Sequence, residues 1–433
     1  MKIAFYTLGC KVNQNETGAL EQLFAAGGFS LAAPGEAADV YVVNSCTVTS
    51  GGDKKSRQWL RRAKREHPDA VTVLTGCYPQ AFPDEAAACA EADIVTGTRA
   101  RAKLLEHVLQ FLQTRERIVD IAPHEKGGAF EELPMEQFEG HTRAFMKIED
   151  GCNRQCAYCV IPRARGFVRS RSEEAILREL SVLAKAGYRE VVFSGINLSS
   201  YGRDTGATLA QLVAKAAGVD GIERIRLGSL EPDLCDDAFI ETLAGVEKLC
   251  PQFHLALQSG CTKTLRAMRR IYTPDEYRAV AAKLRAAIPR AQLTTDVIVG
   301  FPGETQEDFT QSVRFCEEME FLKVHVFTYS RREGTPAASM PGQLTEAEKL
   351  QRNHLLQQAA DAVRARVIGA MRGQAAEVLL ETAVARDTFT GYTREYVPVL
   401  VKAPGRRTGE LVPVTLGAWD ASRERCEAFP APV

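Results

Sequence analysis

The chain has 433 residues, with 54 Lys and Arg against 55 Asp and Glu, and 12 cysteines. Apolar residues make up 45% and charged residues 25%, which is typical of a globular protein and excludes a disordered or low-complexity chain. The net charge of −1 excludes a globally basic nucleic-acid binder, although local basic patches remain compatible with it.

The location of the protein follows from two further features of the sequence. It contains no run of eighteen apolar residues, so we expect no membrane span and no membrane partner. The short apolar run at the N-terminus predicts a strand rather than a signal peptide. We therefore expect a cytoplasmic protein, whose reduced cysteines serve as metal ligands or buried side chains rather than as disulfides.

Residues 1–118 alternate short apolar strands with helical patterns. The expected strands and helices are 2–8, 16–26, 39–44, 53–66, 70–75 and 100–113. This alternation predicts an α/β unit, with a parallel sheet that carries helices on its faces. Residues 119–140 hold two adjacent glycines and two prolines without a clear period, so we expect a linker there.

The rhythm of strand and helix restarts with a longer period in residues 141–366. The expected strands are 144–149, 190–194, 224–229, 252–258, 292–299 and 322–329. Helical patterns separate them, including 173–186, 209–217, 238–243, 275–287 and 305–319. Six such units are too few for an eight-stranded barrel, so we expect a partial one.

A different pattern fills the C-terminal part of the chain. A polar helix is expected over 346–371, and it connects to a third unit at 372–433. Short strands at 376–381, 396–401 and 410–416 predict a small β-barrel or a sandwich for this unit.

Cys152, Cys156 and Cys159 follow the first strand of the second unit with the spacing C-x3-C-x2-C. Three thiolates at this spacing can ligate three irons of a 4Fe–4S cluster. The fourth iron would then be open to a small molecule, as the open position of a catalytic zinc is. A zinc site is the weaker alternative, because no histidine or fourth cysteine lies nearby in the sequence.

The segment resembles the radical S-adenosylmethionine (SAM) superfamily, whose signature is C-x3-C-x-aromatic-C, with Tyr158 as the aromatic residue. The resemblance implies that the open iron chelates SAM and that the reduced cluster cleaves it to a 5′-deoxyadenosyl radical. Cys152, Cys156 and Cys159 would thus be both cluster ligands and catalytic residues. The family has a partial (β/α)6 barrel, which agrees with the six units counted from periodicity.

Cys10, Cys46 and Cys77 each follow a predicted strand of the first unit. Parallel strands end at the same edge of a sheet, so these three cysteines can converge there. A second cluster with three ligands is one interpretation. Three small buried side chains at tight turns are the other, and the spacing alone does not separate them.

The surrounding residues resemble the radical SAM methylthiotransferase family. The similar motifs are GCKVNQ at 9–14, NSCTV at 44–48 and TGC at 75–77. In that family the three cysteines hold an auxiliary 4Fe–4S cluster, and the C-terminal unit is a TRAM domain, a β-barrel that binds RNA. The resemblance therefore covers nearly the whole chain and implies two 4Fe–4S clusters with SAM.

Polar residues at the ends of the predicted barrel strands are candidates for SAM contacts. Such residues are costly on apolar strands unless they are paired or used, and strand ends carry the chemistry in barrels. An ordinary turn or helix cap is the alternative for each. With Tyr158, the resemblance implies SAM contacts at Gly195, Asn197, Ser229, Glu231, Gln258 and Asp296.

Two basic runs flank the predicted clusters. Residues 54–65 hold seven Lys or Arg and no acid, and residues 142–171 hold seven against two acids. A charge run usually forms solvated surface, but these two basic runs could supply phosphate contacts to RNA. Together with two residues of the TRAM-like unit, the candidate RNA contacts are Lys54, Lys55, Arg57, Arg61, Arg62, Arg165, Arg169, Tyr392 and Arg394.

Residues 7–14 are most similar to the MtaB-type branch of the family, which acts on N6-threonylcarbamoyladenosine (t6A) in tRNA. The resemblance implies methylthiolation at C2 of that base, next to the anticodon. The partners would be the tRNA anticodon loop, a flavodoxin- or ferredoxin-like electron donor and a sulfur donor. Modification of another tRNA adenosine or of a ribosomal protein side chain, and a non-catalytic iron–sulfur RNA-binding protein, are the alternatives.

Overall fold

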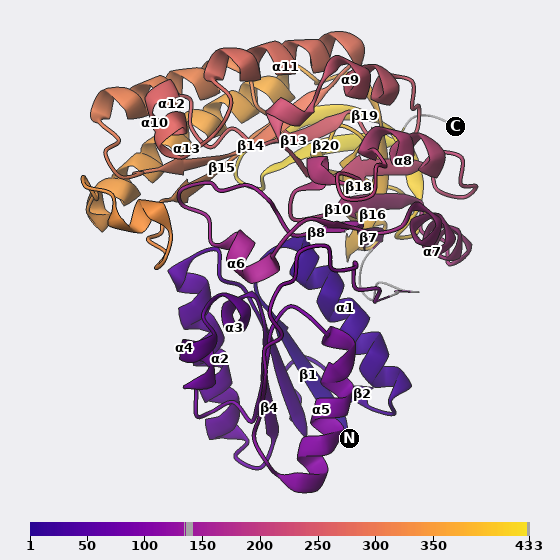
Figure 1. Ribbon diagram of the computed structural model, residues 1–433. Coiled ribbons are helices and arrows are strands. Elements are labelled where there is room, and N and C mark those ends of the chain that lie inside the picture. The colour runs from indigo at the N-terminus through magenta and orange to yellow at the C-terminus, as the bar shows by residue number, and fades with distance from the viewer. Residues whose placement is uncertain (134, 136–141, 431–433) are drawn as a thin grey trace.

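The computed structural model describes residues 1–133, 135 and 142–430 (Figure 1). Part of the predicted linker, 134 and 136–140, therefore lies outside the described residues. The chain forms a lower α/β unit, an upper unit of parallel strands covered by helices, and a small β-barrel beside the upper unit. No helix in the described part of the chain is long and apolar enough to cross a membrane.

The lower unit is built around a sheet of six parallel strands in the order β2-β1-β3-β4-β5-β6. The strands are β1 (Lys2–Thr7), β2 (Ser30–Leu31), β3 (Val40–Ser45), β4 (Val71–Gly76), β5 (Ile94–Thr96) and β6 (Ile118–Asp120). The helices are α1 (Lys11–Ala26), α2 (Ser50–Glu66), α3 (Cys77–Ala81), α4 (Pro83–Ala87) and α5 (Leu104–Thr114). The predicted parallel sheet is confirmed, and the strands missed are the ones of two or three residues, which are too short to show a period.

The upper unit contains the six predicted parallel strand segments. They form two hydrogen-bonded groups, β11-β10-β7 and β12-β13-β14-β15, and the segment predicted at 224–229 is divided between β11 and β12. The bounds are β7 (Arg143–Lys147), β10 (Glu190–Ser194), β11 (Arg224–Leu227), β12 (Ser229–Leu230), β13 (Gln252–Leu255), β14 (Gln292–Val299) and β15 (Lys323–Thr328). The prediction of a partial (β/α)6 barrel is confirmed.

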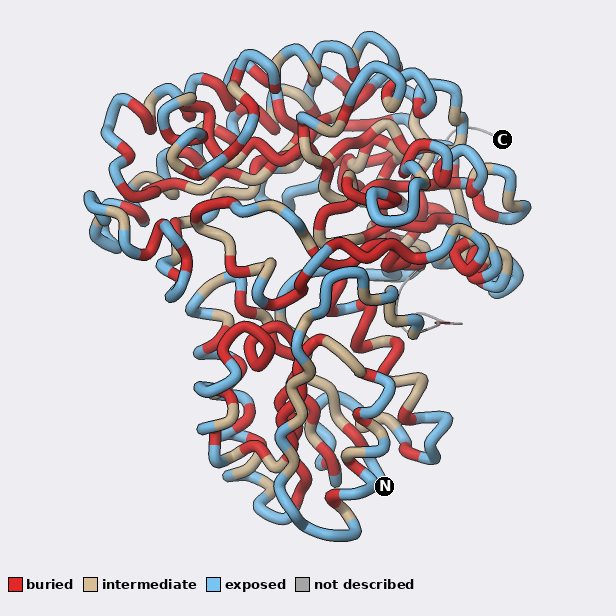
Figure 2. Tube along the Cα trace, in the orientation of Figure 1, coloured by how far each residue is buried: buried red, intermediate tan, exposed pale blue. Residues whose placement is uncertain are grey.

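Helices cover the outside of this partial barrel, as Figure 1 shows along its upper rim. They are α7 (Glu173–Lys185), α8 (Leu209–Ala216), α9 (Asp237–Ala244), α10 (Thr262–Ala267), α11 (Pro274–Ala287), α12 (Gln306–Glu318) and α13 (Glu346–Gly369). Their buried apolar side chains and those of the strands form one core, and the outer helix faces are exposed (Figure 2). Each fully buried Leu, Ile, Val or Phe contributes about 1.5–3 kcal/mol to this packing.

The C-terminal unit is a closed five-stranded barrel, so the structure decides for the barrel over the sandwich. The order is β16-β17-β18-β20-β19, with bounds β16 (Ala375–Ala385), β17 (Thr388–Thr393), β18 (Pro398–Lys402), β19 (Leu411–Asp420) and β20 (Arg425–Pro430). Strands β17 and β20 were not predicted. The barrel is attached to the upper unit by Arg224, whose guanidinium donates to the Glu377 carboxylate at 2.9 Å.

The carboxyl ends of the strands in the lower and upper units face each other. Arg332, after β15, pairs with Asp53 of α2 at 2.6 Å, and both side chains are buried. On the other side, the Thr98 hydroxyl donates to the carbonyl oxygen of Ala164 in α6 (Ile161–Arg165) at 2.7 Å. Because functional residues gather at such strand ends, the junction between the two units is the place to look for a site.

Candidate active site

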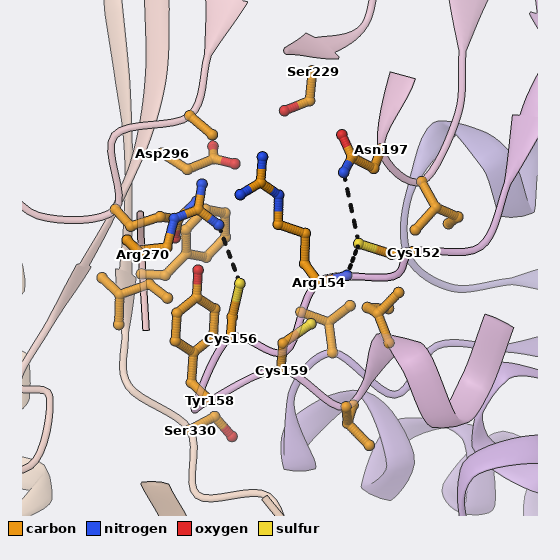
Figure 3. A pocket seen from close by; sticks show the side chains of 18 of the residues that line it. Cys152, Arg154, Cys156, Tyr158, Cys159, Asn197, Ser229, Arg270, Asp296 and Ser330 are labelled. Atoms are coloured by element: carbon orange, nitrogen blue, oxygen red, sulfur yellow. Dashed lines mark hydrogen bonds between the residues drawn. The ribbon is translucent and has the colours of Figure 1, made fainter. Parts of the chain in front are cut away.

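The loop with Cys152, Cys156 and Cys159 leaves the barrel at its first strand. It is closed at its base by an antiparallel pair, β8 (Glu149–Asp150) with β9 (Arg169–Ser170). Gly151 allows this closure: its φ is +91°, and a Cβ there would lie 2.0 Å from the Phe167 carbonyl oxygen. The three thiols are thereby presented together at the mouth of the barrel (Figure 3).

Burial keeps the thiols of Cys152 and Cys159 protonated when no metal is bound. It raises the pKa of Cys152 to about 11 and that of Cys159 to about 12, and the neighbouring Cys156 adds to both shifts. Three sulfur donors without a fourth protein ligand form the donor set of a 4Fe–4S cluster with one open iron. The residues present therefore fit this group, and iron binding must displace the thiol protons.

A cavity of about 310 Å³ borders all three cysteines. Six of the seven predicted SAM-contacting residues line it: Tyr158, Asn197, Ser229, Glu231, Gln258 and Asp296. Gln258 has a φ of +67°, a strained conformation for a residue with a side chain and a common one at binding sites. The mixture of carboxylates, amides and a hydroxyl suits the amino-acid and ribose groups of SAM.

Gly195 lies elsewhere than predicted, because it lines a second cavity rather than the first. A Cβ at this position would come within 2.6 Å of the Glu149 carboxylate, so glycine is needed for packing. Glu149 is fully buried and accepts a hydrogen bond from the Asn197 backbone N–H at 2.8 Å. Burial holds the pKa of the Glu149 carboxyl well above its usual range, so this neutral group shapes the loop that carries Asn197.

Arginines complete the wall of the first cavity, and the sequence patterns did not indicate them. Arg270 donates to the Cys156 sulfur at 3.2 Å and forms an ion pair with Glu231. The Arg154 side chain points into the cavity in Figure 3 and pairs with Asp233. Arg270 thus links the Cys156 sulfur to the Glu231 carboxylate across the wall of the cavity.

The other three cysteines also meet at one edge of their sheet. Cys10 precedes α1, Cys46 follows β3, and Cys77 begins α3. Gly9, at a φ of +103°, lets Cys10 and Cys46 approach, because a Cβ at residue 9 would lie 2.7 Å from that of Cys46. The pKa of Cys77 is raised to about 12, mainly by burial; Arg165 opposes this shift, and the thiols of Cys10 and Cys46 add to it.

A second cavity, of about 490 Å³, adjoins the first. Cys10 lines it on the side of the lower unit. It shares Ser229, Asp296 and Phe327 with the cavity at the other cysteines. A molecule bound here therefore lies beside Cys10 and contacts three residues that also border the cavity of the other cysteines.

The comparisons with known proteins agree with this arrangement. Residues 146–316 match the model of the radical SAM superfamily, and residues 2–97 match that of an uncharacterized protein family, UPF0004. The chain is 40% identical over 420 residues to threonylcarbamoyladenosine tRNA methylthiotransferase MtaB of Bacillus subtilis, covering 96% of this chain and 93% of the relative. The chain belongs to the radical SAM methylthiotransferase family.

Two further comparisons concern a relative with another substrate and a solved structure. This chain is 33% identical to the tRNA-2-methylthio-N(6)-dimethylallyladenosine synthase of Pelotomaculum thermopropionicum, with 96% of this chain and 95% of the relative covered. Among solved structures, TsrM of Kitasatospora setae, a radical SAM methyltransferase, matches with a TM-score of 0.57 at 15% identity, over 78% of this chain and 75% of that chain. The likeness to TsrM shows the fold alone. As a radical SAM enzyme, this protein uses SAM and a 4Fe–4S cluster, and the non-catalytic alternative is set aside.

A buried network of charges connects the two cysteine groups of the methylthiotransferase. Arg165, which follows the loop of Cys152, Cys156 and Cys159 in the chain, is fully buried and pairs with Glu16 of α1 at 2.6 Å. Its Nε also donates to the Cys77 sulfur at 3.2 Å. Lys147 bridges the same Glu16 to Asp150, both at 2.7 Å. The network fixes the distance between the two groups.

The structure corrects two predicted RNA contacts. Arg165 has no exposed surface, and Arg169 is buried and pairs with Asp150 at 3.3 Å. The prediction that these two side chains contact RNA is wrong, because the guanidinium groups neutralise buried carboxylates instead of facing solvent. The error arises because a basic run in the sequence does not show which acids fold against it.

The other predicted RNA contacts have mixed surroundings. Lys54, Lys55, Arg61 and Arg62 are exposed on α2, and Arg57 is partly covered and donates to the Tyr78 hydroxyl at 2.7 Å. Tyr392 lines the second cavity. Arg394 donates to the Leu249 carbonyl oxygen at 3.1 Å, so it holds the small barrel against the larger one.

The network also makes a pH-dependent contribution to stability. Burial alone would raise the pKa of Glu16, but Arg101, Arg165 and Lys147 together lower it to about 2, against an ordinary value of 4.5. A lowered pKa in the folded state means that ionised Glu16 stabilises the protein above pH 4.5 and that this contribution is lost between pH 4.5 and 2. We expect Glu16→Gln to be less stable than the wild type near neutral pH, with a difference that shrinks through this window.

Denaturant unfolding at a series of pH values measures this difference. Glu174→Gln serves as the control, because Glu174 forms an exposed pair with Arg178 on one helix. A constant difference between Glu16→Gln and the wild type from pH 7 down to pH 2 would contradict the role given to the ionised carboxylate.

Proposed function

We propose that this methylthiotransferase acts on C2 of N6-threonylcarbamoyladenosine beside the anticodon of tRNA and forms its 2-methylthio derivative. Relatives named for this substrate support the proposal at 40% identity, in Bacillus subtilis over 96% of this chain and in Aquifex aeolicus over 83%. The dimethylallyladenosine relative is less similar, at 33%. A ribosomal protein side chain has no specific observation in its favour.

The position of the second cavity is the observation that carries the proposal. Replacing a C–H bond by a C–S bond requires removal of a hydrogen atom and delivery of sulfur at one carbon. The cavity meets both needs, since Cys10 lines one side and Ser229 and Asp296, shared with the SAM cavity, line another. A base bound here would lie beside Cys10 and next to the SAM cavity.

The cofactors divide between the two cysteine groups. Cys152, Cys156 and Cys159 would hold the cluster that binds SAM, and Cys10, Cys46 and Cys77 a second 4Fe–4S cluster. When bound, the first supplies a carbon radical from SAM and the second supplies reduced sulfur. The protein contributes the positions of these groups.

Phosphate contacts would come from the exposed basic face of α2, at Lys54, Lys55, Arg61 and Arg62, with Arg57 beside them. The first turn of α2 lies at the mouth of the cavities, because the Ser50 backbone N–H donates to the Ser330 hydroxyl at 3.1 Å and Thr49 lines the SAM cavity. Such contacts position an RNA without reading its sequence. The cytoplasm, a flavodoxin- or ferredoxin-like reductant and a sulfur donor complete the proposal.

Iron content, with product analysis, tests this proposal. In protein reconstituted without oxygen we expect about eight irons and eight acid-labile sulfides per chain. The variant Cys152→Ala/Cys156→Ala/Cys159→Ala and the variant Cys10→Ala/Cys46→Ala/Cys77→Ala should each retain about four. Only the wild type should convert t6A to its 2-methylthio derivative in an anticodon stem-loop RNA, as seen by mass spectrometry of the digested nucleosides.

Cys316→Ala is the matched control, because Cys316 is a buried thiol of α12 outside both groups. It should retain all eight irons and full activity. Four irons in the wild type, falling to none in the first triple variant, would make Cys10, Cys46 and Cys77 structural and would remove sulfur insertion from the proposal.

A further inference from the structure

The second cavity contains more positive charge than its neighbours neutralise. Its lining includes Lys11, Lys323 and Arg364 but a single carboxylate, Asp296. Two imidazoles already lie beside that carboxylate. One ligand atom from each of Asp296, His254 and His325 lies within 4.8 Å of the other two. The charge of Arg364 is neutralised by an ion pair with Glu424 at 3.1 Å.

The two lysines remain without an acidic partner. In the described part of the chain, no carboxylate oxygen lies within 4.0 Å of Lys11 Nζ or Lys323 Nζ. Lys11 Nζ lies 5.6 Å from the centroid of the Phe145 ring, and Tyr396 and Glu190 attract it from a longer distance. Both ammonium groups act on the same imidazole: after burial, which is the main cause, they help to lower the pKa of His325 to about 4. The lysines thus converge on one part of the cavity, beside a neutral histidine that can donate or accept a hydrogen bond.

Two aromatic side chains also line the cavity. The rings of Tyr392 and Tyr396 stack with centroids 4.5 Å apart and an interplanar angle of 15°. Arg226 lies 4.8 Å from the Tyr396 ring centroid, and Arg143 lies 5.1 Å from that of Tyr392. Fixed aromatic rings of this kind can stack on an unpaired base. The cavity therefore combines a surface for a base with a place for an anion.

The chemistry of the proposed substrate matches this combination. An N6-carbamoyl group can donate its terminal N–H to N1 of the adenine, and this hydrogen bond turns the substituent toward the edge that carries C2. A carboxylate on the substituent then lies near the carbon that receives sulfur. A residue that binds this carboxylate must consequently lie beside the sulfur-donating site, and Lys11 is the residue next to Cys10 in the chain.

We propose that Lys11 and Lys323 form an anion subsite that binds the carboxylate of the threonylcarbamoyl group and thereby selects this adenosine over those with neutral N6 substituents. The inference rests on the proposed function and assigns its specificity to two residues. An apolar N6 substituent would leave both ammonium groups desolvated and unpaired, which is how a polar site rejects a neutral analogue.

Binding of three anticodon stem-loop RNAs to the anaerobically reconstituted protein tests the subsite. They are identical except at the target base, which carries t6A, its methyl ester or N6-isopentenyladenosine. The ester keeps the shape of t6A and removes its charge. We expect the wild type to bind the t6A RNA about tenfold to a hundredfold more tightly than the ester, since a charged hydrogen bond contributes about 1.5–3 kcal/mol.

Lys11→Met and Lys323→Met should each reduce this preference for the acid, and the double variant should abolish it while binding the ester as the wild type does. Lys323 is on β15, far in sequence from both cysteine groups, so its variant separates loss of the anion contact from damage at Cys10. Iron content is measured in each variant for the same purpose. Lys55→Met, on the exposed face of α2, should weaken the binding of all three RNAs equally.

Equal affinity of the wild type for the acid and the ester would overturn the subsite. If Lys11→Met and Lys323→Met weaken the binding of the acid and of the ester to the same extent, the subsite is overturned as well. Its failure is distinguishable from failure of the proposed function: a wild type that forms the methylthio product without preferring the acid keeps the function and loses the subsite. A wild type that prefers the acid, loses that preference in the double variant and forms no product keeps the subsite and loses the reaction.

Discussion

Replacing Arg165 by methionine is expected to lower the free energy of unfolding by about 3–5 kcal/mol, the range observed when one partner of a buried ion pair is removed. The Arg165 side chain is fully buried, and it lies 2.6 Å from Glu16 and 3.6 Å from Asp150. Methionine fills much of the volume but leaves these two carboxylates with less positive charge. The variant should also reconstitute fewer irons, because Arg165 donates to the Cys77 sulfur.

Denaturant unfolding and iron analysis measure the two parts of this result. The double variant Arg165→Met/Glu16→Gln should recover part of the lost stability, because it removes the carboxylate left unpaired. Arg178→Met is the matched control: Arg178 pairs with Glu174 on an exposed helix face, and its loss should have little effect. If Arg165→Met unfolds at the same denaturant concentration as the control, the network does not stabilise the junction.

Replacing Arg270 by methionine is expected to lower kcat/KM for SAM cleavage by about a hundredfold, the scale of loss when a binding group is misplaced. Arg270 forms an ion pair with Glu231. It also donates hydrogen bonds to the Cys156 sulfur at 3.2 Å and to the Tyr272 hydroxyl at 3.1 Å. Burial raises the pKa of Glu231, and Arg270 opposes that shift. Without Arg270, the carboxyl would take up a proton at a higher pH and lose its hold on a cationic group.

The pH profile separates this role from simple loss of structure. In Arg270→Met, the KM for SAM should rise as the pH falls through a range in which the wild-type KM is constant, because Glu231 becomes protonated there. Formation of 5′-deoxyadenosine after reduction is the measurement. Arg266→Met is the control and should behave as the wild type, because Arg266 lies four residues earlier, near the end of α10, and is exposed. A KM with the wild-type pH dependence in Arg270→Met would show that Arg270 does not act through Glu231.

The sequence predicted those features that depend on short segments. The strands at 190–194 and 292–299 were predicted at the bounds the structure shows, because alternation of apolar runs and helical periods is a local property. The cysteine loop at Cys152 was predicted from its spacing, and the strand ends at Ser229 and Glu231 line the predicted cavity. Strands of two or three residues, such as β2 and β5, were missed because they show no period.

Errors arose where distant segments meet. The sequence grouped Arg57, Arg165 and Arg169 as basic residues, but the fold exposes part of the first and buries the other two against Glu16 and Asp150. Arg270 carried no signal, because its partners Cys156 and Glu231 are 114 and 39 residues away in the chain. The sequence placed Lys11 in a motif but did not show that its side chain lines a cavity.

The sequence by itself thus determined the order of the three units, the two sets of cysteines and the family. Only the tertiary structure decided that the cavity beside Cys10 adjoins the cavity of the other cysteines, and that Lys11 and Lys323, from different units, line it. The physical reason is that the spacing of ligands and the period of strands are set within a few residues of chain. Burial, charge pairing and cavities depend on which surfaces pack together, and the local pattern does not contain that information.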